Sequence, residues 1–133
     1  DGVLQKTSHL SREEMDVVRT HPKEGFYLLR RCTQNMTILS AVSEHHERID
    51  GSGYPHKIKN PSICGQIIGV ADYFTARQEP RVYRPTRLTM AESYDATMVQ
   101  PFASDVLMAF QQVYLAACRS TAGNINTLRV KRR

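Results

Sequence analysis

The sequence predicts an all-α domain, and three observations favour this class. Apolar residues recur at spacings of three and four along most of the 133-residue chain, and no alternating run typical of a strand stands out. The form Ser/Thr-x-x-Glu of a capping box occurs at Ser11 and again at Thr89. Prolines fall at the boundaries between the periodic segments. The length suits one domain with a sizeable core.

The first two helices are separated by a His-Pro pair. Residues 11–14, "SREE", start a helix that should end near Thr20, because a proline restricts the residue before it. Pro22 suits the first turn of a second helix, and residues 34–35 are typical of a break. The apolar residues expected to face the core from this helix are Phe26, Leu28 and Leu29.

A third helix, 36–47, leads into adjacent histidines. Steps of three and four from Ile38, Leu39 and Val42 reach His45 and His46, so both imidazoles should continue the buried stripe. The three polar residues just beyond look exposed; they are Glu47, Arg48 and Asp50. A loop rich in glycine and proline should cover residues 49–60.

The most apolar helix is expected over residues 61–78, followed by a second loop at 79–85. Its apolar side comprises Ile63, Ile67, Ile68, Ala71 and Phe74. Further helices should run from Thr89 to about Val99 and from Ser104 through Ala117. We therefore predict one domain over residues 1–117, with a polar, basic and loosely ordered tail at 118–133.

The basic balance does not indicate a nucleic-acid-binding face. Four of the five net positive charges come from the last five residues, which leaves about one for the rest of the chain. Nucleic acid is therefore not an expected partner. The sequence has no apolar run long enough for a membrane span, and its three cysteines are odd in number and far apart. These features favour a cytoplasmic protein with reduced thiols.

Four side chains have the chemistry of a metal site: His21, His45, His46 and Asp72. Imidazole and carboxylate groups together suit divalent transition metals such as iron, manganese and zinc. Asp72 lies within the apolar run "IIGVADYFTA", where a buried unpaired carboxylate would be costly. From spacing alone, ordinary structural roles are favoured over a metal site. A histidine before a proline is commonly a surface or capping residue, and a lone aspartate on a helix can bond a neighbour.

The order of three stretches adds to this interpretation. "HHERIDGSGYP" at 45–55, "IIGVADYFTA" and "RVYRP" together resemble the HD-GYP family of cyclic di-GMP phosphodiesterases, within the HD phosphohydrolase superfamily. The resemblance implies an HD-domain-like helical bundle, corresponding to the C-terminal part of that domain. It also implies a divalent metal cluster, most often iron or manganese, and hydrolysis of cyclic di-GMP to the linear dinucleotide or GMP.

The resemblance assigns roles residue by residue. The implied metal ligands are His21, His45, His46 and Asp72. The implied substrate contacts are Tyr54, Arg81 and Arg84, and guanidinium groups suit phosphate through their paired donors. Gly51 and Gly53 should let the backbone bend tightly beside the site. For Asp50 we expect a role in the turn or in orienting a ligand histidine.

One part of the family pattern has no counterpart. The sequence contains no His-Asp dipeptide, and the lysine that follows this pair in the family is missing with it, so no catalytic residue is assigned. The chain is thus expected to be a C-terminal part of an enzyme domain with little turnover by itself. The alternative is a degenerate, non-catalytic module that binds cyclic di-GMP or docks a GGDEF domain through the GYP loop. The sequence gives no indication of oligomeric state.

Overall fold

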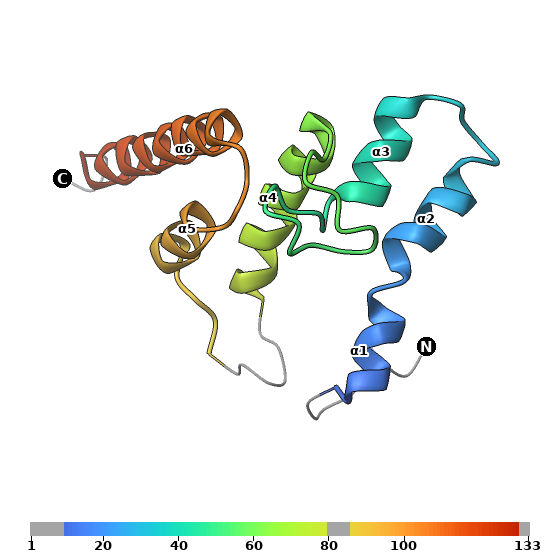
Figure 1. Ribbon diagram of the computed structural model, residues 1–133. Helices are drawn as coiled ribbons and strands as arrows, with labels where there is room; N and C mark the ends of the chain where they lie inside the picture. The colour runs from blue at the N-terminus through green and yellow to red at the C-terminus, as the bar shows by residue number, and fades with distance from the viewer. Residues whose placement is uncertain (1–9, 80–85, 131–133) are drawn as a thin grey trace.

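The computed structural model describes residues 10–79 and 86–130, and side chains up to residue 120. The described residues form helices and no strand, which confirms the predicted all-α class. The helices are α1 (Arg12–Val18), α2 (His21–Leu29), α3 (Met36–Glu44), α4 (Ile63–Gln78), α5 (Met90–Met98) and α6 (Ser104–Val130). Helix α3 packs between α2 and α4, and α4 also contacts α5 and α6 (Figure 1).

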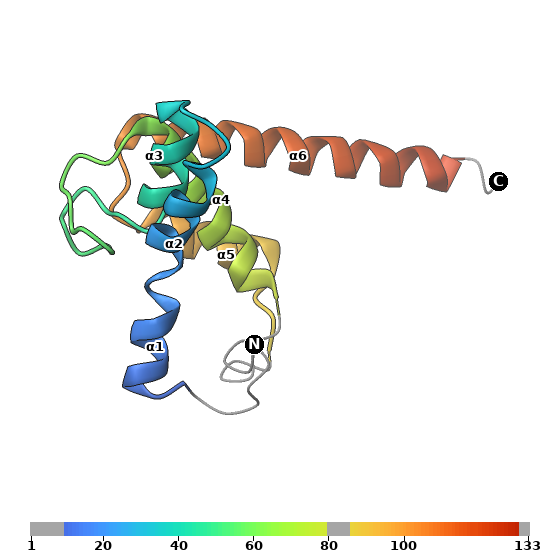
Figure 2. The same cartoon turned by 90° about the vertical axis from the view of Figure 1, so that its right-hand side faces the viewer.

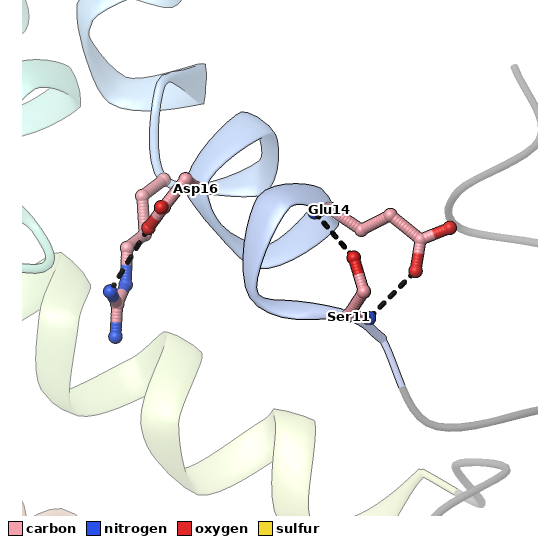
Figure 3. A network of polar contacts seen from close by, with 4 residues as sticks. Ser11, Glu14 and Asp16 are labelled. Carbon is pink, nitrogen blue, oxygen red and sulfur yellow. Dashed lines mark hydrogen bonds and ion pairs between the residues drawn. The ribbon is translucent and has the colours of Figure 1, made fainter.

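The helix starts follow the predicted capping signals. At α1 the Ser11 hydroxyl accepts the amide of Glu14 while the Glu14 carboxylate accepts the amide of Ser11, a complete capping box (Figure 3). Thr89 and Glu92 form the same arrangement at α5. The predicted break at 34–35 becomes a cap, because the Asn35 side chain accepts the amides of Thr37 and Ile38.

Two glycines bring α4 against the end of α3. A Cβ at Gly65 would lie 2.8 Å from the Cβ of Glu44, and one at Gly69 would lie 2.3 Å from the carbonyl oxygen of His45. Such distances leave no room for a side chain, so the small residues determine which side of α4 packs. The buried residues of α4 are Gly65, Gln66, Gly69 and Val70.

The apolar side predicted for α4 is therefore not the packed side. Ile63, Ile67 and Ile68 are 57%, 51% and 48% exposed. The latter two line an apolar hollow of about 490 Å³ between α3 and α4, together with Ile38 and Val42. Helical periodicity identified the apolar stripe of α4, but the side of α4 that packs against α3 is the side of Gly65 and Gly69, where the two backbones approach closely.

The core lies where α4 meets the start of α6. Val70, Phe102 and Val106 are buried, and Ala103, Leu107 and Phe110 pack on them. Gln66 is also buried: its side-chain oxygen accepts the amide of Ala103 at 2.8 Å, while its amide group donates to the Pro61 carbonyl. This glutamine links α4 to the turn before α6 without leaving a buried polar group unpaired.

Helix α6 extends away from the other helices (Figure 2). It continues to Val130, so the predicted end at Ala117 is too early. The third helix ends at Glu44 rather than at residue 47. The division into residues 1–117 and 118–133 stays a prediction. None of the helices in the described part of the chain combines the length and hydropathy that a membrane span requires.

Candidate metal centre

Three histidines from two separate segments converge on one point. His21 is the first residue of α2, and His45 and His46 follow the last turn of α3. The Nε2 atom of His21 lies 3.1 Å from that of His45 and 3.2 Å from that of His46. Metal–nitrogen bonds of about 2.0–2.1 Å place neighbouring ligand atoms about 3 Å apart, so the spacing fits one shared ion.

The backbone orients two of the rings for this role. The Nδ1 atoms of His21 and His45 each lie 2.7 Å from the carbonyl oxygen three residues earlier, on Val18 and Val42. Since a carbonyl only accepts, each Nδ1 carries the proton and each Nε2 presents a lone pair. Two lone pairs 3.1 Å apart repel one another, and a cation between them removes that repulsion.

Partial burial keeps His45 and His46 neutral. Burial lowers the pKa of His46 to about 3, and the neighbouring His45, His21 and Arg48 act in the same direction. Burial also lowers the pKa of His45, while its bond to the Val42 carbonyl and the charge of Asp72 oppose this shift. Neutral imidazoles at physiological pH are the protonation state that metal ions require.

Asp72 lies near this cluster but on a more open surface. Its charge opposes the lowering of the His45 pKa by burial and adds to the rise of the Tyr54 pKa, which places the carboxylate within electrostatic reach of both groups. The close group formed by the described His, Cys and acidic side chains comprises His21, His45 and His46, without Asp72. Asp72 is exposed, so the argument from a costly buried carboxylate is wrong: its side of α4 faces outward.

The loop after the histidines is held by a buried carboxylate. Glu47, expected to be exposed, is 0% exposed. Its Oε1 accepts the amides of His56 and Lys57 at 2.6 and 3.1 Å, and its Oε2 accepts the amide of Ile58 at 3.2 Å. Glu47 therefore binds the far end of the loop back to the chain directly after His45 and His46.

Glycine permits the close return of this loop. A Cβ at Gly53 would lie 2.4 Å from the Cα of Glu47 and 2.5 Å from the carbonyl oxygen of His46. Gly51 adopts a φ of 80°, and the Asp50 side chain accepts the amide of Ser52 at 2.9 Å, so Asp50 has the predicted turn role. The bond to Ser52 also lowers the pKa of Asp50.

Tyr54 is placed against the histidines by this return. Its amide donates to the His46 carbonyl at 3.2 Å, and its ring stacks on the His46 ring with centroids 4.5 Å apart. Burial raises the pKa of the phenol, as does the charge of Asp72, so the hydroxyl stays protonated near neutral pH and can donate a hydrogen bond.

Arg48 joins the site to the core. Its Nη1 donates to the carbonyls of His45 and Glu47 at 3.2 and 2.7 Å, and its guanidinium lies 4.3 Å from the centroid of the Phe102 ring. The residue thus satisfies carbonyls at the end of α3, and the cation–π contact fixes that end against the core.

The structure thus unites His21, His45, His46 and Tyr54, with Asp72 nearby, whereas Arg81 and Arg84 lie outside the described residues. Sequence reasoning missed Glu47 and Arg48. The sign available for Glu47 was its place in the stretch 45–55 immediately after two histidines, because a charged residue there can bond the amides of a following turn.

Comparison with known proteins agrees with the geometry. Residues 2–99 match the family model described as HD domain. A cyclic di-GMP phosphodiesterase response regulator of Xanthomonas campestris pv. campestris is 38% identical over 88 residues, 63% of this chain and 23% of the relative. A cyclic di-GMP phosphodiesterase of Thermotoga maritima is 40% identical over 88 residues, 63% of this chain and 24% of the relative.

Relatives with another named substrate also match. A 3'3'-cGAMP-specific phosphodiesterase of Vibrio cholerae is 32% identical over 86 residues, 63% of this chain and 20% of the relative. The chain spans about a quarter of the length of these curated relatives or less. The match over residues 2–99, the helical fold and the histidine cluster confirm the expected resemblance: the chain belongs to the HD domain family.

Proposed function

We propose that the chain is part of a metal-dependent phosphodiesterase that hydrolyses cyclic di-GMP to the linear dinucleotide or GMP in bacterial signalling. The observation that carries this proposal is that the Nε2 atoms of His45 and His46 lie 3.1 and 3.2 Å from that of His21, in a chain related to cyclic di-GMP phosphodiesterases. Because the sequence has no His-Asp dipeptide, we expect little or no turnover from the chain by itself.

The proposed ligands are His21, His45, His46 and Asp72, and the proposed metals are iron or manganese. The Nε2 lone pairs of His21 and His45 already face one another, and Asp72 adds negative charge near His45. When bound, divalent metals supply Lewis acidity and lower the pKa of a coordinated water. The contribution of the chain is to keep His45 and His46 neutral through burial and to orient the rings of His21 and His45 before any ion arrives.

The proposed substrate contacts are Tyr54, Arg81 and Arg84. The protonated Tyr54 hydroxyl can donate to a phosphate oxygen beside the histidines, since its ring is stacked on His46. For Arg81 and Arg84 the support is the stretch "RVYRP" and the match of guanidinium to phosphate. Replacing Arg81 by alanine should weaken dinucleotide binding and leave metal content unchanged; loss of metal would contradict this role.

The metal site is tested by the metal content of the chain purified without oxygen. We expect bound iron or manganese in the parent chain and its loss in His46→Ala. The matched control is His56→Ala, because His56 is an exposed histidine on the same loop and lies outside the cluster. Unchanged metal in His46→Ala, or equal loss in both variants, would contradict the ligand assignment.

Substrate identity needs a second assay. Relatives named for cyclic di-GMP and for 3'3'-cGAMP both match this chain, so both nucleotides should be compared on protein that retains metal. We expect preferential binding of cyclic di-GMP. Preference for 3'3'-cGAMP would keep the reaction class and correct the substrate.

We also propose a cytoplasmic location and a GGDEF domain as partner of the loop 51–59. The exposed side chains of His56, Lys57 and Lys59 leave that loop accessible. Purified GGDEF domain should bind the parent chain and lose affinity for a variant with these three residues changed to alanine. Equal binding by both would contradict the assigned surface.

A further inference from the structure

A polar cleft of about 530 Å³ borders Tyr54, where α1 ends, α2 begins and residues 52–57 pass alongside. None of the three clustered histidines lines it. Tyr54 nevertheless lies between the two sites. Its ring stacks on His46, and it also lies 5.8 Å from the guanidinium carbon of Arg19, which lines the cleft. A nucleotide bound near the histidines would therefore have this cleft as a neighbour.

The charge of the cleft is positive. Its lining includes Arg19, Lys23 and Lys57 and a single carboxylate, Asp16. That carboxylate forms an ion pair with Arg19 at 3.4 Å (Figure 3). Within the described part of the chain, no ion pair engages the ammonium group of Lys23 or Lys57. Two cations thus remain for an anion that enters the cleft.

Lys57 occupies a backbone conformation that lysine rarely adopts. Its φ is 55°, in the left-handed region, which is unfavourable for a residue other than glycine. The buried carboxylate of Glu47 holds the strained residue by accepting its amide at 3.1 Å. Glycine or asparagine would adopt this turn at less cost, so the backbone alone does not explain a lysine here.

The start of α2 adds a third favourable feature. Thr20 and Lys23 line the cleft, so the helix begins beside it. The Thr20 hydroxyl donates to the Val17 carbonyl at 2.8 Å and makes no cap bond to the first amides of the helix. The positive end of a helix dipole therefore lies next to two lysines, which favours an anion further.

We propose that this cleft binds the terminal phosphomonoester of a nucleotide. A phosphomonoester carries about −1.5 to −2 charges near pH 7, which matches the two lysines better than the single charge of a phosphodiester. This inference rests on the proposed function. Hydrolysis adds hydroxide to phosphorus and a proton to the departing ribose oxygen, so ring opening creates a phosphomonoester that the cyclic substrate lacks. The cleft then holds the linear product by its new end.

Calorimetric titration of the metal-free chain tests the proposal without any need for turnover. GMP should bind at low salt, guanosine should not bind, and cyclic di-GMP should bind at least about tenfold more weakly than GMP, a difference of about 1.4 kcal/mol. Inorganic phosphate should compete with GMP. Equal affinity for guanosine and GMP, or tighter binding of cyclic di-GMP, would overturn the phosphomonoester assignment.

Three variants locate the bound phosphate. Lys23→Gln and Lys57→Gln should each weaken GMP binding about tenfold, whereas Lys59→Gln should not, because Lys59 is exposed on the same loop but outside the cleft. Lys23 lies on the first turn of α2, so its variant remains informative if Lys57→Gln unfolds the loop. Unchanged affinity in the Lys23 variant would refute the site.

The histidine cluster provides the last control. His45→Gln should leave GMP binding to the metal-free chain unchanged within about twofold, since His45 neither lines the cleft nor stacks on Tyr54. Loss of GMP binding in His45→Gln would place the phosphate at the histidines and refute this inference. Failure of the proposed function would show separately, as absence of bound metal or of preferential cyclic di-GMP binding by protein that retains metal.

Discussion

Replacing Glu47 by alanine should release residues 56–58 of the GYP loop from the end of α3 that carries His45 and His46. The Glu47 carboxylate is fully buried and accepts three backbone amides, those of His56, Lys57 and Ile58. A buried amide without a partner costs about 1–3 kcal/mol, and these three bonds are only partly buried. At the lower end of that range, Glu47→Ala should lower the free energy of unfolding by about 3 kcal/mol.

The glutamine variant separates shape from charge. The side-chain oxygen of Glu47→Gln can still accept the amides of His56 and Lys57, but its NH₂ group would face the amide of Ile58, donor against donor. We therefore expect a smaller loss of about 1–2 kcal/mol.

Urea unfolding of the metal-free chain is the appropriate assay, with the midpoint compared at constant slope. Glu24→Ala is the matched control, because Glu24 is an exposed glutamate in the first turn of α2 and should change stability by less than about 0.5 kcal/mol. Metal affinity should also fall in Glu47→Ala, since Tyr54 and His46 lose their fixed contact. A stability loss no larger than that of Glu24→Ala would refute the anchoring role.

Three further outcomes are expected. Gly69→Ala should lower the free energy of unfolding by about 1–3 kcal/mol and weaken metal binding, because its Cβ would lie 2.3 Å from the His45 carbonyl oxygen. Gly25→Ala is the control: its Cβ would meet only a side chain, so urea unfolding should show a smaller loss of stability. In EDTA, the free energy of unfolding should contain a contribution from neutral His46 that is fully present above pH 6.5 and is lost as the pH falls toward about 3. The reason is that burial lowers the pKa of His46 from 6.5 to about 3 in the folded chain, so the unfolded chain binds the additional proton in this range. Thermal unfolding across this pH range should show a shallower dependence in His46→Ala, and an identical slope would refute the assignment. Arg48→Met should keep the apolar contact with the core but lose two hydrogen bonds to carbonyls. We therefore expect a fall of about 1–3 kcal/mol in the free energy of unfolding and weaker metal retention. An unchanged free energy of unfolding together with unchanged metal content would refute the role of Arg48.

The local signals in the sequence were sufficient for most helix boundaries. The capping boxes at Ser11 and Thr89 and the position of Pro22 depend on bonds within a few residues, and the structure confirms them. The third helix stops at Glu44, short of its predicted end at 47, because the chain turns at the histidines to form the site. The spacing of apolar residues does not indicate where that turn begins.

Side-chain burial was less predictable. Asp72 lies in an apolar stretch and is exposed, whereas Glu47 lies in a polar stretch and is 0% exposed. The two errors have different origins. Glu47 lies beyond the end of α3 and is buried because its carboxylate accepts amides of the following loop. For Asp72, periodicity indicates which residues share a side of the helix, but not which side meets a neighbour. For α4 that choice depends on Gly65 and Gly69, which permit contact with the backbone of α3.

By itself the sequence determined the all-α class, the helix starts and the residue types of the candidate centre, because propensity, capping and motif spacing are properties of short stretches. Only the tertiary structure decided that the Nε2 atoms of His45 and His46 lie 3.1 and 3.2 Å from that of His21. It also decided that Glu47 holds the loop and that two lysines share a cleft with Tyr54. These are contacts between segments distant in sequence, and their distances are set by the packing of whole helices.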